Sequence, residues 1–203
     1  MRYMDGTKKA SIRREGVFDC MKLEMVKIRK ARPEEVEQVI HFYHSLIDEM
    51  QNSKFSPGWE KNVYPASDYI KDSISKGELF LAEHVAKIAG AMVINHEYNE
   101  SYNTYAWENT PGKEQISVIH ALGVHPEFSG RGVGKQMVSE AINMCRENSQ
   151  SVIRLDVLKG NLPAERLYQS MGFEYRTTIP MFYEDTGWTD YELFELIISG
   201  GAR

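Results

Sequence analysis

The stretch VHPEFSGRGVGK, from Val124 to Lys135, follows the apolar run QISVIHALGV and precedes a segment whose apolar residues recur at helical spacing. It holds three glycines, Gly130, Gly132 and Gly134, which let a ligand approach the backbone without meeting a Cβ. Unpaired N–H groups and the helix dipole make the start of a helix attractive to anions. The stretch therefore predicts a phosphate cradle on a strand-to-helix turn.

A glycine-rich turn can also occur without a ligand, so the cradle needs a second feature to support it. Two other phosphate-binding motifs fit the stretch poorly. A Walker P-loop requires Ser or Thr after its lysine, whereas Gln136 follows Lys135. A dinucleotide-binding fingerprint reads G-x-G-x-x-G, and here the third glycine comes one residue early.

The second feature is the pattern N-x-x-A-x-x-x-Y-x-x-x-G-F, which runs from Asn161 to Phe173. Asn161 and Tyr168 are separated by seven positions, which on a helix leaves them about 20° apart in direction, on one side. Their helix and the helix after Gly132 both start where a strand of the predicted parallel pair ends. Open α/β sheets bind ligands at that edge.

The order of the remaining elements predicts an α/β (α+β) fold. The strand–helix–strand–helix–strand order of the second half predicts parallel pairing there, and the short link before Lys87 predicts an antiparallel pair. Expected strands are 26–31, 78–83, 87–95, 115–124 and 152–157, with two more in FEYRTTIPMFYE and DYELFELII; expected helices run from Pro33 to Met50 and over 67–76, 132–148 and 162–171. Residues 1–24 are expected to be an extension, with one short helix around 17–25, and residues 25–203 a single domain.

Bulk composition excludes several classes of protein. A chain of 203 residues, 42% hydrophobic, suits one globular domain. Its net charge of -5 and its few short basic stretches argue against nucleic-acid binding. Cys20 and Cys145 form no CxxC pair, which favours a reduced, cytoplasmic protein without a zinc site or a disulfide framework. No apolar run reaches the roughly 20 residues that cross a bilayer, and the N-terminus does not have the pattern of a secretory signal.

Together the two motifs resemble the GNAT N-acetyltransferase superfamily, over roughly Val26 to Ile198. The resemblance implies a mixed, twisted sheet of about six or seven strands flanked by about four helices, splayed between the fourth and fifth strands. It also implies acetyl-CoA as co-substrate and no metal. The leading hypothesis is transfer of the acetyl group to a primary amine of a small molecule, by direct attack within a ternary complex. A homodimer is suggested by analogy alone.

The resemblance assigns roles to residues of both motifs. N–H groups of the glycine-rich turn hold the CoA pyrophosphate, the end of the preceding strand pairs with the pantetheine arm at a bulge, and Tyr168 protonates the departing thiolate. Ser129 stands where the family usually has Gln or Arg, which removes a side-chain contact but leaves the backbone cradle. The expected CoA contacts are Leu122, Gly123, Val124, Ser129, Gly130, Arg131, Gly132, Val133, Gly134, Lys135, Asn161, Ala164 and Tyr168.

Several of these residues have a structural alternative. Asn161 is equally suited to cap its helix, and Tyr168 to be a buried, hydrogen-bonded aromatic. His120 is the strongest titratable group on the strand 115–124, with the parity of Leu122 and Val124, and is the candidate general base or a core histidine.

Other titratable groups are weaker candidates. Glu108 and Glu114 are weaker options for the base. His41 and His44 have metal-binding spacing but no evident carboxylate partner, so a solvated face is favoured. Cys145 is expected in the core, which favours direct transfer.

The acceptor site is the least defined part of the prediction. Trp59, Tyr64, Tyr183 and Glu184 are the candidate substrate-binding residues, and their aromatic and acidic character suits a small cationic amine. The alternative is a solvated turn with its aromatics in the core. Two other functions stay open, a protein or peptide N-acetyltransferase and an acyl-CoA-binding sensor without turnover.

Overall fold

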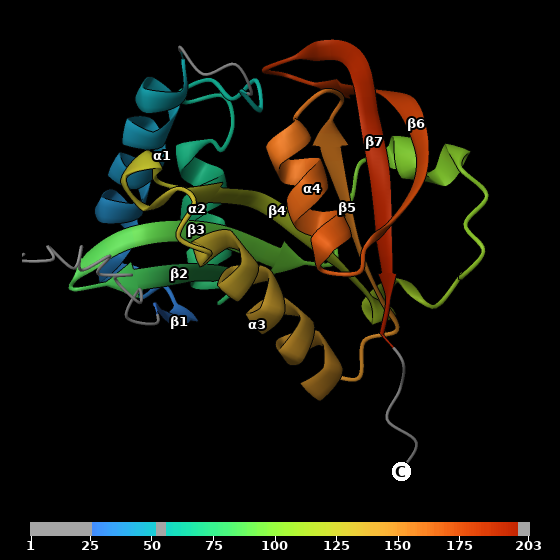
Figure 1. Ribbon diagram of the computed structural model, residues 1–203, viewed down its shortest axis with the longest axis horizontal. Coiled ribbons are helices and arrows are strands. Elements are labelled where there is room, and N and C mark those ends of the chain that lie inside the picture. The colour runs from blue at the N-terminus through green and yellow to red at the C-terminus, as the bar shows by residue number, and fades with distance from the viewer. Residues whose placement is uncertain (1–25, 52–55, 199–203) are drawn as a thin grey trace, which may run out of the picture.

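The computed structural model describes residues 26–51 and 56–198. They form one seven-stranded sheet in the order β1-β2-β3-β4-β5-β7-β6 (Figure 1). The strands are β1 (Lys27–Lys30), β2 (Leu79–His84), β3 (Lys87–Asn95), β4 (Ile116–Val124), β5 (Val152–Leu158), β6 (Glu174–Tyr183) and β7 (Gly187–Ile197). The helices are α1 (Val36–Met50), α2 (Ser67–Ser75), α3 (Val133–Glu147) and α4 (Leu162–Ser170), with 3-10 turns η1 (Pro33–Glu35), η2 (Glu100–Thr104), η3 (Lys113–Gln115) and η4 (Pro126–Phe128). The predicted fold class is confirmed, whereas the extension 1–24 and the helix around 17–25 lie outside the described residues.

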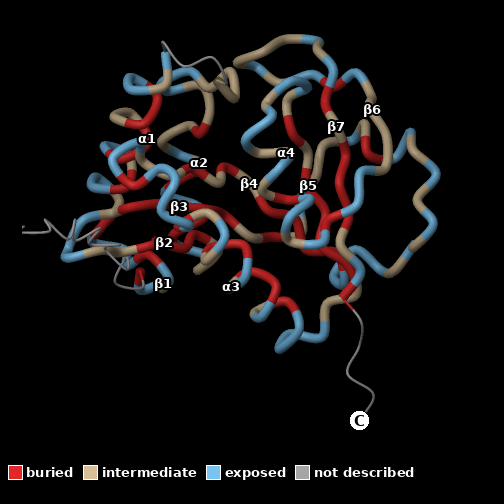
Figure 2. The backbone as a smooth tube through the Cα atoms, viewed as in Figure 1, coloured by how far each residue is buried: buried red, intermediate tan, exposed pale blue. Residues whose placement is uncertain are grey.

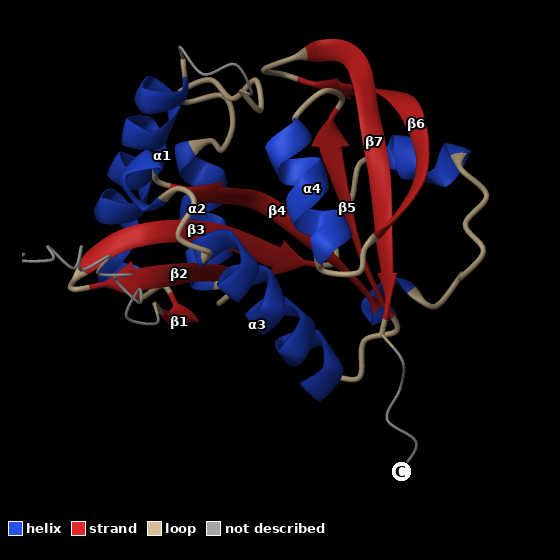
Figure 3. Ribbon diagram, viewed as in Figure 1, coloured by secondary structure: helices blue, strands red, loops and turns tan. Residues whose placement is uncertain are grey.

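The helices cover the two faces of the sheet (Figure 3). α1 and α2 pack on one face through a cluster that includes Val39, Tyr43 and Ile70. α3 and α4 cover the other through a larger cluster that includes Met137 and Tyr168. Figure 2 shows that buried residues follow the central strands, which are covered on both sides. Side chains that alternate along a central strand therefore reach opposite layers.

β4 and β5 separate soon after they begin to pair. Their parallel pairing extends only from Ile116↔Val152 to Val118↔Arg154. Beyond Val118 the edge of β4 that faces β5 has no strand partner among the described residues, and in Figure 1 the two strands diverge from a common start. The predicted splay between the fourth and fifth strands is confirmed.

A β-bulge in β4 accompanies the splay. His120 pairs with Val93 and Gly123 with Ala91, so β4 has one residue more than β3 between these pairs. Ala121 takes a positive φ of 47°, and its carbonyl accepts a 2.9 Å hydrogen bond from the Tyr43 hydroxyl. An extra residue bends a strand and reverses the facing of the residues beyond it. His120 therefore does not face the same side of the sheet as Leu122 and Val124, and the prediction that the three share a face is wrong.

β7 lies between β5 and β6 and is antiparallel to both. This placement carries the β6–β7 turn to the end of the sheet where β4 and β5 have separated (Figure 1). The segment that contains η2 packs against β5 through Arg154, whose guanidinium bonds Asn109 O at 2.6 Å and lies 3.8 Å from the Trp107 ring centroid. The buried Arg154–Glu195 ion pair, at 3.0 Å, anchors this contact to β7.

Candidate functional site

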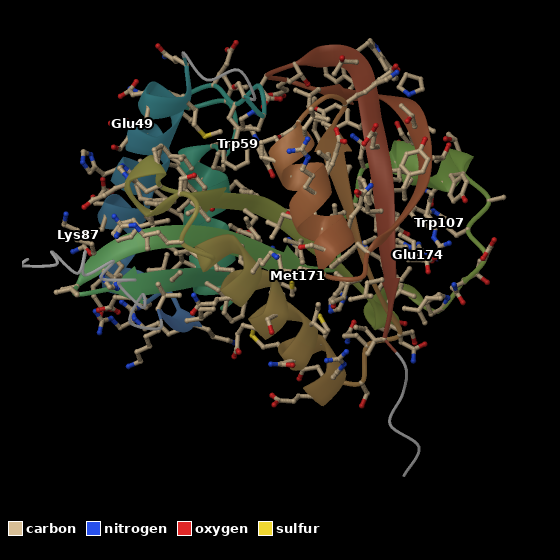
Figure 4. All side chains as sticks on the ribbon, in the orientation of Figure 1. Glu49, Trp59, Lys87, Trp107, Met171 and Glu174 are labelled. Atoms are coloured by element: carbon tan, nitrogen blue, oxygen red, sulfur yellow. The ribbon has the colours of Figure 1, made fainter. Side chains whose placement is uncertain are left out.

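A cavity of about 1170 Å³ occupies the gap between β4 and β5. Its wall comes from the end of α1, the segment 57–64, β4, the start of α3, β5, α4 and the β6–β7 turn. Trp59 and Glu49 line it from the α1 side, and Figure 4 shows Trp59 between α1 and α4. The volume exceeds the ~300–1,000 Å³ of typical small-ligand pockets, which suits two substrates held at once.

The glycine-rich turn forms an open backbone cradle at one end of this cavity. Gly130 and Gly132 have positive φ values of 72° and 82°, and nothing lies within 4 Å of a Cβ built on either one. The first helical bond of α3 runs from Gln136 N to Gly132 O at 3.0 Å. The N–H groups from Gly132 to Lys135 have no acceptor among the described residues. An anion could therefore bind these donors, as the sequence predicts.

The other residues of the predicted CoA set mostly line the same cavity. Leu122, Gly123, Val124, Ser129, Gly130, Gly132, Val133, Gly134, Lys135, Asn161, Ala164 and Tyr168 are all in its wall. Arg131 is not in the wall; it is exposed, with its guanidinium 5.8 Å from the Phe128 ring centroid. Gly134 is needed for packing, because a Cβ there would lie 3.2 Å from Leu167 Cδ2 of α4. The two motifs therefore meet in space as the sequence predicts.

Asn161 and Tyr168 lie on the cavity side of α4. Asn161 is the N-cap of the helix, where Oδ1 accepts the Ala164 N–H at 3.5 Å. Tyr168 is 6% exposed and packs edge-to-face on Phe173 with ring centroids 5.5 Å apart. Its hydroxyl makes no hydrogen bond within the described part of the chain. Burial, followed by the charge of Asp156, raises the pKa of Tyr168, which therefore keeps its proton at neutral pH.

Asp156 of β5 is a site residue that the sequence did not single out. Its Oδ2 accepts hydrogen bonds from the hydroxyls of Tyr102 at 2.8 Å and Tyr183 at 3.1 Å. Burial raises the pKa of Asp156, and the two tyrosine hydroxyls partly oppose that rise by stabilising the carboxylate. Oδ1 has no hydrogen-bond partner within the described ranges, and the residue lines the cavity. The side chain is thus a carboxylate with one oxygen held and one available.

Asp156 and Tyr168 approach the gap from opposite faces of the sheet. Leu155 and Val157 of β5 pack into the α3/α4 cluster that contains Tyr168. Asp156, between them in sequence, points to the other face and reaches Tyr102 of η2. Both side chains line one cavity because the strands have parted between them. An acid and a base on opposite sides of a bound reactant are thereby possible.

His120 also lines the cavity, with its proton on Nε2. This nitrogen lies 2.9 Å from both Asn95 Oδ1 and Glu97 O. Asn95 Oδ1 accepts the Glu97 N–H at 3.0 Å, so both partners of Nε2 are acceptors and Nδ1 is the unprotonated nitrogen. Burial lowers the pKa of His120 to about 4, against smaller opposing effects of Glu97. His120 is therefore neutral at pH 7 and a weak base.

Three of the four predicted acceptor residues share the far end of the cavity. Trp59, Tyr64 and Tyr183 line it, with ring centroids 5.9 Å apart for the first pair and 6.5 Å for the second. Glu184 is exposed and outside the wall, so the structure does not bring it to the cavity with the other three. Its neighbour Asp185 lines the cavity instead, because consecutive residues of the turn point in different directions.

The remaining candidates lie away from the cavity. Glu108 and Glu114 are exposed, and neither lines it. Cys145 is buried on α3, where burial raises the pKa of its thiol. Within residues 26–51 and 56–198, no three His, Cys, Asp or Glu side chains form a metal-binding group, His41 and His44 included. Over the same ranges, no helix has the length and apolar character needed to span a membrane.

Comparison with known proteins identifies relatives of the chain. A sequence model described as the acetyltransferase (GNAT) family matches residues 41–173, which is more than half of the chain. The L-amino acid N-acyltransferase MnaT of Escherichia coli is 28% identical over 114 residues, 54% of this chain and 66% of that protein. The [ribosomal protein bS18]-alanine N-acetyltransferase of Haemophilus ducreyi is 29% identical over 94 residues, 46% of this chain and 65% of that protein. The match thus spans less than two thirds of either relative.

A solved structure shares the fold. A putative acetyltransferase from Salmonella typhimurium, determined with its cofactor acetyl-CoA, aligns with a TM-score of 0.64 at 17% identity. The alignment covers 89% of this chain and 98% of that one. At this identity the likeness concerns the fold.

Proposed function

The chain belongs to the acetyltransferase (GNAT) family, and we propose that it transfers the acetyl group of acetyl-CoA to the primary amine of a small molecule. The observation that carries the proposal is one cavity that joins an anion cradle to a carboxylate across the gap between β4 and β5. The N–H groups of the cradle suit the diphosphate of CoA. The unpaired edge of β4 beyond Val118 suits the amide groups of the pantetheine arm.

In the proposed reaction, Asp156 Oδ1 accepts a proton from the amine as its nitrogen attacks the thioester carbonyl. The new N–C bond forms while the C–S bond breaks, and Tyr168 donates its hydroxyl proton to the departing sulfur. Asp156 suits this role because its raised pKa makes it a stronger base than a free carboxylate. His120 stays a second candidate for the base, made weaker by its lowered pKa. Cys145 lies outside the cavity wall, which supports direct transfer over an acyl-enzyme.

A small acceptor is favoured because aromatic side chains wall the far end of the cavity. A peptide acceptor, like the ribosomal protein named for the Haemophilus relative, stays the alternative. Release of free thiol from acetyl-CoA, measured with small amines and with peptides that offer an N-terminal alanine or a lysine, separates the two. Release with small amines supports the proposal, and release with peptides alone contradicts it. Tight CoA binding without release with any amine would favour a sensor.

The cradle can be tested by Gly132→Ala. At φ 82° an L-residue costs roughly 1–2 kcal/mol, so the backbone is expected to relax and turn its N–H groups away from the diphosphate. The dissociation constant of CoA, measured by calorimetry, is expected to rise about tenfold. Gly187→Ala is the matched control, because Gly187 also has a positive φ, 63°, and open space around its Cβ, but lies outside the cavity wall. An equal effect of both variants on CoA binding would contradict the assignment.

Tyr102 is proposed to position Asp156 and to tune its pKa. Because the Tyr102 hydroxyl stabilises the ionised carboxylate, Tyr102→Phe should raise the pKa of Asp156. The base must be ionised to act, so the acid limb of the kcat/KM–pH profile should move to higher pH, by roughly one unit. Tyr98→Phe is the control, since Tyr98 stacks on Tyr102 at 5.6 Å without bonding Asp156.

A limb that stays in place in Tyr102→Phe, yet disappears in His120→Ala, would instead identify His120 as the base. The compartment and the possible homodimer stay predictions of the sequence.

A further inference from the structure

The charged residues of the cavity wall come from different elements. The basic side chains in the wall are Lys135 at the start of α3 and Arg166 on α4, the two helices that carry the cradle and Tyr168. The acidic ones are Glu49 at the end of α1, Asp156 on β5 and Asp185 in the β6–β7 turn. β5 and the β6–β7 turn thus contribute the carboxylates of Asp156 and Asp185 to the wall, and no lysine or arginine of the described residues lines the cavity from these two elements.

Asp185 lines the cavity from the β6–β7 turn and is half-buried. It forms no ion pair with another described residue. Burial raises the pKa of Asp185, hydrogen bonds from the backbone N–H groups of Asp185 and Thr186 oppose that rise, and the charges of Glu60 and Glu184 add to it. A half-buried carboxylate among other negative charges is a strong site for a cation.

Aromatic rings connect Asp185 to Asp156. The Tyr183 hydroxyl bonds Asp156, and its ring lies 5.0 Å from that of Tyr191. The Tyr191 hydroxyl in turn lies 2.8 Å from Oγ1 of Thr186, the residue after Asp185. The charges of both carboxylates act on Tyr191. Tyr183 and Tyr191 therefore connect the surroundings of the two acids, and aromatic rings attract ammonium groups and pack against their alkyl stems.

We propose that the acceptor is an alkyl diamine, with one amine reacting at Asp156 and a second ammonium held at Asp185 beside Tyr183 and Tyr191. The inference rests on the proposed acetyl transfer and specifies its acceptor. A free α-amino acid fits poorly, because its carboxylate would lie beside the carboxylates of Asp156 and Asp185. The proposed acceptor thus differs from that named for the Escherichia coli relative, an L-amino acid.

Three acceptors of similar size test the proposal through kcat/KM for thiol release from acetyl-CoA. Butane-1,4-diamine has both ammonium groups, pentan-1-amine replaces one by a methyl group, and L-ornithine adds a carboxylate to the diamine. We expect butane-1,4-diamine to exceed each of the other two by about ten- to a hundredfold, the effect of one charge-assisted hydrogen bond. Equal values for diamine and monoamine, or a preference for L-ornithine, would overturn the inference.

Asp185→Asn tests the assigned residue. The ratio of kcat/KM for diamine over monoamine should fall toward one in this variant. Glu192→Gln is the matched control, because it removes one negative charge from β7 on the opposite side of the strand from Tyr191 and outside the cavity wall. A ratio that survives Asp185→Asn would contradict the role of Asp185, and the wild-type comparison needs no variant to fold.

The proposed acetyl transfer and the proposed diamine acceptor are contradicted by different results. If no amine releases thiol from acetyl-CoA, the proposed function itself is wrong. If monoamines are acetylated without a preference for diamines, acetyl transfer stands and the diamine inference is wrong.

Discussion

Replacing Asp156 by asparagine is expected to lower kcat/KM for acetyl transfer by about a hundred- to ten-thousandfold, the usual contribution of a general base. The amide has the size of the carboxylate and can still accept from Tyr102 and Tyr183 through its oxygen. It has no charge and cannot take the proton of the attacking amine. The dissociation constant of CoA should change little, because the cradle lies at the other end of the cavity.

The matched control is Asp190→Asn. Asp190 is an exposed residue of β7 that pairs with Lys159 at 3.0 Å and lies outside the cavity wall. Its loss should leave kcat/KM unchanged within about twofold, since exposed ion pairs contribute little. Turnover in Asp156→Asn that matches the control would remove Asp156 from the mechanism and leave His120 as the remaining candidate.

Tyr168→Phe is expected to lower kcat by about a hundredfold while the dissociation constant of CoA stays nearly constant, the pattern of a group that acts only in the transition state. The ring keeps its contact with Phe173, so only the hydroxyl is lost. Tyr175→Phe is the control, because it removes a tyrosine hydroxyl at an exposed site, where its one contact is local, 2.9 Å from Thr178 Oγ1. Steady-state kinetics and calorimetry together give both quantities.

A second acetyl donor makes this test of Tyr168 more specific. If Tyr168 protonates the leaving sulfur, an acetyl thioester of an aryl thiol, whose thiolate leaves without a proton, should reduce the defect of Tyr168→Phe. An equal defect with both donors would indicate that the hydroxyl orients the substrate, and an unchanged kcat would exclude any catalytic role.

The donor side of the site could be predicted from the sequence because its information is local. Gly130 to Lys135 and Asn161 to Tyr168 each lie within one turn or helix, so their spacing predicts which of them share a side, and the family resemblance supplies the roles expected of them. Most element boundaries were predictable to within a residue or two for the same reason, although α1 and β7 begin three residues from their expected starts. The helix expected from Gly132, for example, begins at Val133, with Gly132 as its N-cap.

The acceptor side depends on contacts between distant segments. Asp156 is one of two charged residues in the otherwise apolar strand VIRLDVL. Its carboxylate is oriented by hydrogen bonds from Tyr102 and Tyr183, which lie 54 and 27 residues away in sequence. The insertion of β7 between β5 and β6 brings the second of these to it. No periodicity in the sequence predicts the bulge at Ala121. Because of this bulge, His120 does not face the same side of the sheet as Leu122 and Val124. Glu184 and Asp185 are chemically similar neighbours, and only the folded turn shows that Asp185, rather than Glu184, lines the cavity.

Mass spectrometry of a reaction with deuterium-labelled acetyl-CoA and butane-1,4-diamine tests the central claim most directly. Direct transfer at the gap between β4 and β5 predicts that the label appears on the diamine, that free CoA is released in equal amount, and that the mass of the protein does not change at any time. A labelled protein that forms before the labelled amine, or CoA that stays fully acetylated in the presence of amines and peptides, would contradict it.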